Sequence, residues 1–387
     1  MLVTVAVVAA LLAAAFLFAR VAQYAGFPPA ASIVLVGIAA GGMLPHALQV
    51  ALTPGVLALF LPALIFEAAW DLDARALRST ALAIAVLAVP GVIVTALAIA
   101  AGGLLGGLAL PAACALGAIL CATDPVAVIA LFRSLDVPLD LLTIVEGESI
   151  ANDGVAVVLL QAVTSAVARP GPIPYASLIG HAAYVTVAGS AIGVALALGA
   201  TPLLRGERPS WLAIAVTLGV AYGAYGLASL AGASGIFASA AAGVALPTLS
   251  FAVAEQRAVE HFWDATALVA NGVVFLLVGL SLQFERIFHE PLLLAATLSA
   301  VVVARLFLAY VLVPLRGSRA AVVGRRHAIA LAGVRGGLSL ALALGLPVDF
   351  PNRPAIIDAV FAVVFATVVV QGWALAPLLR RISVPAR

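Results

Sequence analysis

Long apolar stretches, separated by short clusters of Pro, Gly and charged residues, repeat along the whole chain. A helix needs about 20 apolar residues to cross the hydrocarbon core of a membrane, and one such stretch follows another here. With Pro, Gly and charges taken as breaks, the pattern predicts thirteen spans: residues 2–24, 29–47, 53–70, 79–105, 110–133, 141–168, 177–204, 209–230, 233–248, 262–283, 290–315, 327–347 and 354–379. We therefore expect an all-α polytopic membrane protein.

Composition supports an integral membrane protein and narrows its partners. The chain is 65% hydrophobic and 9% charged, with a mean hydropathy of +1.22, whereas a soluble fold needs far more charge to cover its surface. The formal net charge of +2 predicts no nucleic-acid partner. Cys114 and Cys121 lie seven residues apart in an apolar stretch, which favours small core residues over a redox pair. The first stretch lacks a basic leading region, so it is predicted to be a span and not a signal peptide.

Arginine is the only basic residue apart from histidine, and its distribution predicts the orientation. If the spans alternate and the N-terminus lies outside, fourteen arginines fall on the cytoplasmic side. Only Arg169, Arg286 and Arg353 fall outside, as the positive-inside rule requires. We expect a plasma or inner membrane protein with a cytoplasmic C-terminus. Arg305 and Arg335 are left within predicted spans.

An internal echo relates the second and ninth predicted spans. VGIAAGGMLP at 36–45 is similar to ASAAAGVALP at 238–247. An offset of seven spans places the second copy upside down, which is the inverted-repeat arrangement of many secondary transporters. Small-residue patterning alone could also produce this match, so both readings stay open.

Two acids are predicted at similar depth near the middle of the membrane. Pro125, within CATDPVAVIA at 121–130, disfavours helical geometry at Asp124 and frees backbone carbonyls around Thr123. At 1.5 Å per residue, Asp124 lies roughly 21 Å along its segment and Asp153 roughly 18 Å along the next.

The stretch EGESIANDG at 146–154 adds further polar residues. Glu148 and Asn152 are four apart, as are Ser149 and Asp153, so one helix presents two adjacent polar stripes. Glu146 is nearer the cytoplasmic end and is expected to reach the interface.

Each ionised group at a helix centre costs about 2.5–3.5 kcal/mol. Buried ion pairs that hold the bundle together are the plain structural explanation of this cluster. However, the predicted spans contain three such acids, Asp124, Glu148 and Asp153, and only two arginines, Arg305 and Arg335. One carboxylate therefore has no arginine to pair with. A midplane carboxylate can hold a proton in one state and a cation in another, and oxygen ligands suit hard cations. Such a site is sufficient for coupled cation and proton exchange when it is exposed to the two sides of the membrane alternately.

The motifs ATDPVAV at 122–128 and EGESIANDGVAVVL at 146–159 resemble the paired signatures of the monovalent cation/proton antiporters, in the NhaP and NHE branch. Similar matches run through LPALIFEAAWDLD at 61–73, FWDATALVANGVVFLLVGLSL at 262–282 and LAGVRGGLSLALAL at 331–344. Isoleucine and alanine replace the usual pair of leucines before the asparagine and aspartate. The resemblance covers nearly the whole transport unit.

This resemblance implies an NhaA-like fold of about 13 helices, with inverted repeats, two broken crossing helices and no enzymatic activity. It also implies a homodimer in membrane lipid and an elevator movement that serves pH homeostasis. Residues 1–387 then form one transport unit, with a dimerisation domain of residues 1–78 and 170–284 and a core domain of residues 79–169 and 285–387.

The family also implies roles for individual residues. Asp153 matches the aspartate that carries the ion and the proton, and Glu148, Ser149 and the Thr123 carbonyl match further ligands of Na⁺ or K⁺. Asp124 is expected to stabilise opposed helix ends. Arg305 is expected to pair with Glu148, and Arg335 to balance charge at the second broken helix. Asn152 before Asp153 is typical of the electroneutral branch, one cation for one proton, and no cofactor is expected.

Three alternatives remain at the level of sequence. GASG at 232–235 has the form of an intramembrane serine protease motif, with His261 or His327 as a possible base, and paired midplane acids could serve an aspartyl protease. A cation channel would need polar rings along a pore, whereas these groups collect at one depth. Glu67 is predicted either to guide cations toward the site or to be a simple interfacial acid.

Overall fold

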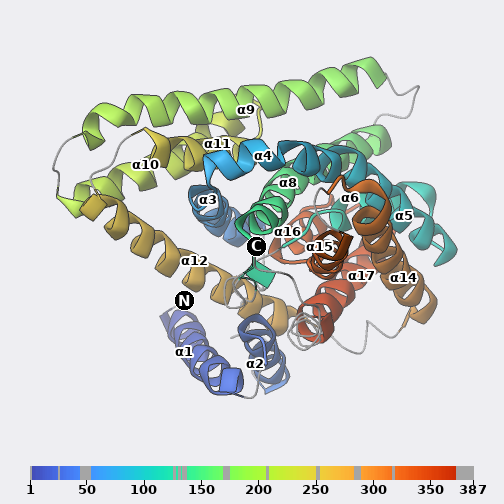
Figure 1. The fold of residues 1–387 in the computed structure, drawn as a ribbon. Coiled ribbons are helices and arrows are strands. Elements are labelled where there is room, and N and C mark those ends of the chain that lie inside the picture. The colour runs from blue at the N-terminus through green and yellow to red at the C-terminus, as the bar shows by residue number, and fades with distance from the viewer. Residues whose placement is uncertain are drawn as a thin grey trace.

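The computed structural model describes residues 2–24, 27–43, 54–124, 128–129, 132, 137–168, 175–205, 209–249, 253–282, 289–315 and 319–371. Within these ranges every regular element is a helix, and eight helices are long and apolar enough to cross a membrane (Figure 1). Pro125, eight of the arginines used to predict orientation, and the ends of several predicted spans lie outside the described residues.

The helices of the first half follow the predicted spans closely, with extensions at charged ends. They are α1 (Leu2–Tyr24), α2 (Pro29–Met43), α3 (Pro54–Trp70), α4 (Ala74–Val86), the π-helical segment η2 (Leu87–Gly91), α5 (Val92–Leu105), α6 (Leu110–Leu120) and α8 (Leu139–Ala168). α4, η2 and α5 form one helical rod, which widens at η2 around Pro90 because proline has no N–H to donate. The span predicted from residue 79 therefore begins five residues earlier, at Ala74, where Asp73 caps the helix.

The second half of the chain also consists of long helices and of helices that are interrupted or continue into π-helical segments. Its elements are α9 (Tyr175–Leu204), α10 (Ser210–Leu230), α11 (Gly235–Thr248), α12 (Val253–Ser281), α14 (Pro291–Phe307), η3 (Leu308–Leu312), α15 (Arg319–Leu331), α16 (Gly337–Leu344), α17 (Arg353–Phe365) and η4 (Ala366–Gln371). The span predicted at 327–347 is thus two helices with a non-helical link. Arg353 stabilises the end of α16, because its guanidinium donates to the carbonyls of Leu344 and Leu346 at 3.1 and 3.0 Å.

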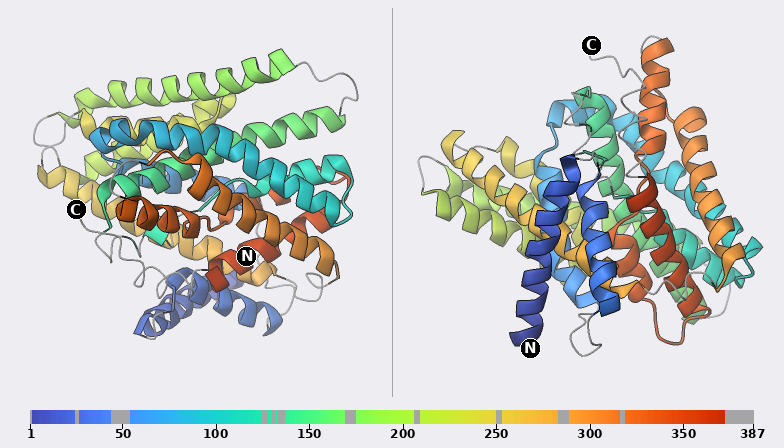
Figure 2. Two further views of the ribbon diagram at one scale, coloured as in Figure 1. Left: turned by 45° about the vertical axis from the view of Figure 1, so that its right-hand side comes forward. Right: turned by 90° about the horizontal axis from the view of Figure 1, so that it is seen from below.

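Small residues bring some backbones into direct contact. A Cβ atom on Gly37 of α2 would collide with the carbonyl of Leu276 on α12, and one on Gly279 of α12 would collide with the carbonyl of Val34. Only glycine permits this approach, which is common between helices in membranes. The other views show α2 lying between α1 and the end of α12 (Figure 2).

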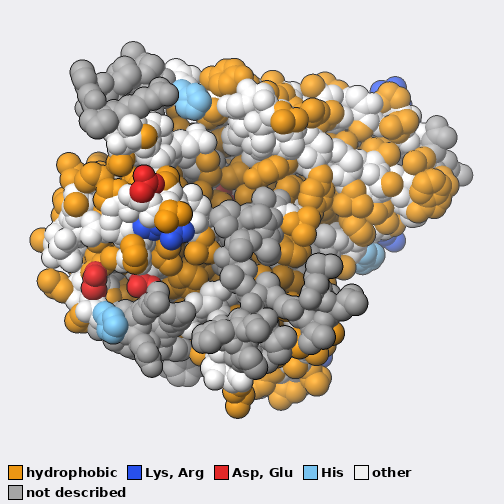
Figure 3. Space-filling model, turned by 180° about the vertical axis from the view of Figure 1, so that it is seen from behind, with side chains coloured by type: hydrophobic (Ala, Val, Ile, Leu, Met, Phe, Trp, Pro, Cys, Tyr) orange, Lys and Arg blue, Asp and Glu red, His pale blue; other side chains and the backbone are white. Residues whose placement is uncertain are grey.

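Two large groups of buried apolar side chains hold the bundle together. One gathers residues of α3, α9, α10, α11 and the first half of α12, with Phe66 against Trp263 at 4.7 Å between ring centroids. The other gathers α5, α6, α8, α14, α16 and α17, and also takes in α1, α2 and the second half of α12. The exterior is apolar too, since Leu17, Leu97 and Leu198 are exposed and hydrophobic side chains cover much of the rear face (Figure 3). An apolar exterior is what a lipid environment requires.

Candidate functional site

Two interrupted helices meet in the middle of the bundle. α6 ends at Leu120 and Cys121–Asp124 continue without helical structure, while α15 ends at Leu331 and Ala332–Gly336 link it to α16. The N–H of Asp124 donates to the carbonyl of Val334 at 2.8 Å, and the hydroxyl of Ser339 donates to the carbonyl of Ile119 at 3.1 Å. These bonds satisfy backbone groups that the interruptions leave without helical partners.

Each interruption places a charged residue near the end of the opposite helix. A Cβ atom on Gly336, the residue that precedes α16, would collide with the Asp124 side chain, so this carboxylate lies against the N-terminus of α16. Arg335 lies near Cys121, the residue at the C-terminal end of α6. Anions stabilise helix N-termini and cations stabilise C-termini, so the placement is favourable at both ends.

The polar stripes of α8 face the first interruption. The Ser149 hydroxyl donates to the Thr123 carbonyl at 2.6 Å, and the Asn152 amide nitrogen lies 3.4 Å from both the Thr123 hydroxyl and a Glu148 carboxylate oxygen. The Thr123 carbonyl therefore accepts a hydrogen bond from a side chain of α8.

The expected pairing of Glu148 with Arg305 is present. The two side chains are buried, with 1% and 5% exposed, and the guanidinium contacts both carboxylate oxygens, one of them at 3.1 Å. Arg305 Nε also donates to the carbonyl of Ile329 at 2.8 Å, so the guanidinium is well satisfied. Glu148 has both oxygens engaged by its arginine and is poorly placed to bind a cation as well.

Arg335 is buried on the link before α16, and its role in charge balance stays a prediction. It is 1% exposed, its backbone N–H donates to Thr367 Oγ1 at 3.1 Å, and its guanidinium donates weakly to the Gly333 carbonyl at 3.5 Å. Its Nε has no acceptor, and no described carboxylate lies within ion-pair distance of it. The link that carries Arg335 places it near Cys121 at the end of α6 and also near Glu148.

Asp153 makes no ion pair with an arginine in the described part of the chain. Its Oδ1 is buried and has no hydrogen-bond partner in the structure. Asp124 is close enough to interact with it electrostatically, and both line one cavity of about 510 Å³. The two acids thus belong to one site, while their depth in the membrane stays a prediction.

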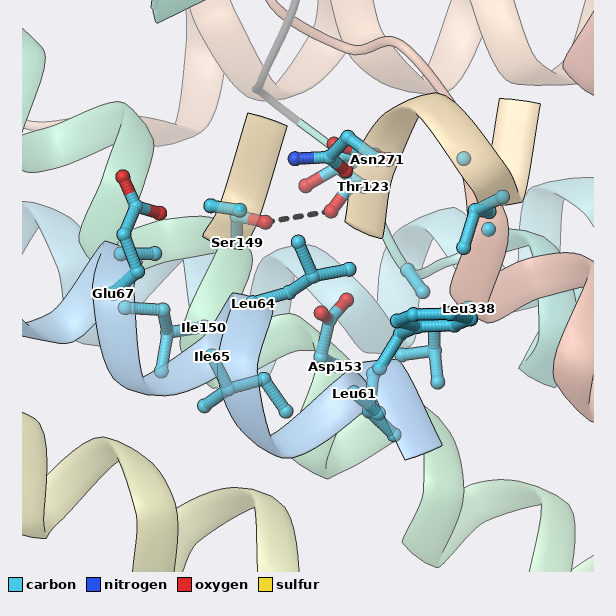
Figure 4. Close-up of a pocket in the computed structure, with 18 of the residues that line it drawn as sticks. Leu61, Leu64, Ile65, Glu67, Thr123, Ser149, Ile150, Asp153, Asn271 and Leu338 are labelled. Atoms are coloured by element: carbon cyan, nitrogen blue, oxygen red, sulfur yellow. Dashed lines mark hydrogen bonds between the residues drawn. The ribbon is translucent and has the colours of Figure 1, made fainter. Parts of the chain in front are cut away.

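The cavity is lined by more acids than sequence reasoning assigned to it. Its carboxylates are Glu67, Asp124, Glu146, Asp153 and Asp264, joined by Thr123, Ser149 and Asn271 among largely apolar neighbours. Figure 4 shows Glu67, Asp153 and Asn271 around this space, with the Ser149 to Thr123 hydrogen bond at its wall. The expectation that Glu146 reaches the interface is wrong, because Glu146 is 4% exposed and lines the cavity.

Asp264 and Asn271 are the cavity residues that the sequence reading missed. Both belong to α12 and are seven residues apart, which places them on one helical face. That spacing was the available signal. Carboxylate oxygens of Glu67, Asp71 and Asp264 also lie within 4.8 Å of one another where α3 faces α12.

The serine protease motif has a structural explanation. Gly232 has a φ of +68°, as the turn after α10 requires, and the Ser234 hydroxyl accepts a hydrogen bond from the N–H of Phe237 as the N-cap of α11. The Ser234 side chain therefore has a capping role.

The arrangement as a whole is suited to binding a small hard cation. It offers the unpartnered Oδ1 of Asp153, the Ser149 hydroxyl and the oxygens of Thr123 beside the cavity, and no described histidine or thiolate lines it. Asp153 can also take a proton in place of the cation.

Known proteins match the chain over almost its full length. The family described as "Sodium/hydrogen exchanger, transmembrane" matches residues 7–381. The Na⁺/H⁺ antiporter NhaS2 of Synechocystis is 34% identical over 96% of this chain and 69% of its own length. ApNhaP, an Na⁺/H⁺ antiporter of Aphanothece halophytica, is 33% identical over 85% of this chain and 64% of its own length. The chain thus spans about two thirds of the length of these relatives.

The fold has a solved counterpart. The sodium proton antiporter MjNhaP1 of Methanocaldococcus jannaschii superimposes with a TM-score of 0.79 at 17% identity, covering 98% of this chain and 99% of that one. Together with the family match, this means that the chain belongs to the transmembrane sodium/hydrogen exchanger family.

Proposed function

We propose that this protein exchanges Na⁺ for H⁺ across a plasma or inner membrane, with the two ions competing for Asp153. The observation that carries the proposal is the buried Asp153 Oδ1, which has no hydrogen-bond partner and belongs to a cavity-lining side chain. A proton or a cation supplies the missing partner. Because one carboxylate serves both ions, binding of one excludes the other, and exposure to each side in turn produces exchange.

The cation ligands that we propose are the Asp153 carboxylate, the Ser149 hydroxyl and the Thr123 carbonyl, with Asn152 and Asp124 in support. The short bond from Ser149 to Thr123 holds two of these oxygens together. Because Glu148 is paired with Arg305, we give it a supporting role. The proposed cation ligands therefore leave out Glu148, which the family resemblance had included. The names of NhaS2 and ApNhaP as Na⁺/H⁺ antiporters favour sodium over potassium or lithium as the physiological cation.

We further propose a fold of thirteen spans in two inverted repeats. The packing supports this, because the second span, α2, packs on the tenth, α12, while the ninth, α11, packs on the third, α3. If the repeat relates each span to the one seven positions away, the second span corresponds to the ninth and the tenth to the third. The contact between the second and tenth spans then corresponds to the contact between the ninth and third. The interrupted segments formed by α6 and by α15 with α16 are also seven spans apart, and they meet at the site.

An elevator movement within a homodimer is proposed on this basis. Residues 79–169 and 285–387 would form the moving core, and residues 1–78 and 170–284 the dimerisation domain. The apolar group that joins α3, α9, α10 and α11 supports a separate second unit. The N-terminus is proposed to lie outside and the C-terminus in the cytoplasm, from the arginine distribution.

Reconstitution into liposomes tests the function. An imposed pH gradient should drive sodium uptake into vesicles that contain the parent protein, and Asp153→Ala should abolish it. Thr297→Ala, which alters a buried hydroxyl on α14 that does not line the cavity, serves as a control for folding in the membrane. Undiminished flux in Asp153→Ala would overturn the assignment of the site.

Stoichiometry and selectivity are tested with the same vesicles. One-for-one exchange predicts flux that does not change when valinomycin and potassium clamp the membrane potential. Flux that follows the imposed potential would contradict it. Sodium, lithium and potassium are compared at equal concentration.

A further inference from the structure

A second cavity lies between two pairs of helices. It has a volume of about 690 Å³ and is lined by residues of α4 and α8 on one side and α9 and α11 on the other, with Leu72 at one end. α4 packs along α8 and α9 packs along α11 (Figure 1), and residues of both pairs line the cavity. Apolar side chains dominate its wall, among them Ile84, Val194, Phe237 and Val244. A cavity of this size matches those that hold small organic ligands.

One end of this cavity carries two arginines. Arg75 and Arg78 lie in the first two turns of α4, both are exposed, and both line the cavity. In the described part of the chain, neither guanidinium lies within ion-pair distance of a carboxylate. The nearby Asp73 caps α4, since its carboxylate accepts from the N–H groups of Arg75 and Ala76 at 2.9 and 2.7 Å.

We infer that this cavity binds an anionic phospholipid, with the headgroup phosphate on Arg75 and Arg78 and an acyl chain along the apolar wall. The positive end and the apolar length match the two parts of such a molecule. Guanidinium groups bind phosphate oxygens through paired hydrogen bonds, and basic pockets between membrane helices suit anionic headgroups. Water alone would not fill an apolar space of this size favourably, and the membrane supplies phospholipid at high concentration.

The bound lipid would fill space that neither helix pair fills, so it should stabilise the folded protein. Ligands that bind only the folded state raise the apparent Tm. The test therefore measures thermal stability of the full chain in detergent, with added dioleoylphosphatidylglycerol, dioleoylphosphatidylcholine or inorganic phosphate. We expect phosphatidylglycerol to raise the Tm by about 2–4 °C more than phosphatidylcholine, and phosphate to have no effect.

Two variants and a control locate the effect. Arg75→Gln with Arg78→Gln removes the headgroup site, and Ala241→Leu narrows the apolar part; both should lose the preference for phosphatidylglycerol. Arg20→Gln with Arg257→Gln removes two exposed arginines that do not line the cavity, and it should keep the preference. A variant that is misfolded would show a lowered Tm without lipid, and milder Arg75→Lys with Arg78→Lys should then retain part of the effect.

Three outcomes would overturn the inference. Equal stabilisation by phosphatidylglycerol and phosphatidylcholine would show that the cavity does not recognise an anionic headgroup. Stabilisation by phosphate alone would show that a free anion suffices. An unchanged preference in the Arg75 and Arg78 variant would place the lipid elsewhere. Sodium and proton exchange does not enter any of these measurements, so they stand apart from the proposed function.

Discussion

The guanidinium of Arg305 on α14 contacts both carboxylate oxygens of Glu148 on α8, across 157 residues of sequence and in the buried centre of the bundle. The pair joins α8 to α14. Arg305 also donates to the carbonyl of Ile329 in the last turn of α15, so the same guanidinium connects three helices. Each charge is compensated only while the other is present.

Removing one member of this pair should destabilise the protein more than removing both. We expect Glu148→Leu or Arg305→Met alone to cost about 3–5 kcal/mol, because the remaining charge is then buried without a partner. The double variant should cost less than the sum of the two. Thermal unfolding followed by size-exclusion chromatography provides the measurement.

The partly exposed pair of Asp140 with Arg325, at 3.0 Å, is the matched control. Its removal should cost about 0–1 kcal/mol, since solvent screens it. Additive effects of Glu148→Leu and Arg305→Met would contradict a direct energetic coupling.

Competition at Asp153 predicts a specific pH dependence. As pH falls through the range in which Asp153 takes up its proton, the apparent KM for sodium should rise by up to about tenfold per pH unit, because one proton displaces one cation. At alkaline pH the KM should become constant. Initial rates of sodium uptake at fixed pH on both sides of the vesicle give this profile, and a KM that does not vary with pH would argue against a shared site.

Gly336 should not tolerate a side chain. Gly336→Ala places a methyl group where Asp124 lies, so we expect a loss of stability on the order of 1–3 kcal/mol together with reduced exchange. Gly219→Ala on α10 is the control, since a Cβ atom there meets nothing within 4 Å and should be neutral or stabilising by about 0.4–1 kcal/mol. Wild-type stability and exchange in Gly336→Ala would mean that Asp124 can move away without loss.

Glu67 should raise the local concentration of cations at the cavity. We expect Glu67→Gln to raise the apparent KM for sodium about two- to tenfold with little change in maximal rate, and the effect should shrink at high ionic strength. Asp264→Asn should act in the same direction, as its carboxylate is close to that of Glu67. Glu290→Gln, an exposed acid away from the cavity, should leave KM unchanged. A loss of maximal rate in Glu67→Gln would instead indicate a direct role in translocation.

Sequence reasoning predicted the helices well where apolar stretches end at turn residues. The span predicted at 209–230 is α10 at Ser210–Leu230, and that predicted at 177–204 is α9 at Tyr175–Leu204. It placed helix starts too late where a charged, amphipathic turn precedes the apolar part, as at Ala74 of α4 and Val253 of α12. Hydropathy measures suitability for lipid, whereas a helix also continues through water-facing residues.

The site was predictable in its chemistry but not in its full membership. Counting charges predicted one carboxylate without an arginine, and the family resemblance pointed to Asp153, whose Oδ1 has no partner in the structure. Glu146 was misplaced because distance along the helix does not show which way a side chain faces, and this one faces the cavity wall. The contributions of α12 depend on how α12 faces α3, which no local pattern in either helix specifies.

The unpartnered oxygen of Asp153 has a consequence for the electrical work of transport. With a proton or with sodium bound, the carboxylate adds no net charge to the unit that moves, so under the proposed exchange both loaded forms cross without opposing the membrane potential. The empty form would carry one negative charge, and moving it through 100 mV changes the energy by about 2.3 kcal/mol. Under the proposed exchange, one acid whose charge is cancelled by either ion would make the two productive crossings insensitive to voltage and leave only the unproductive crossing sensitive to it.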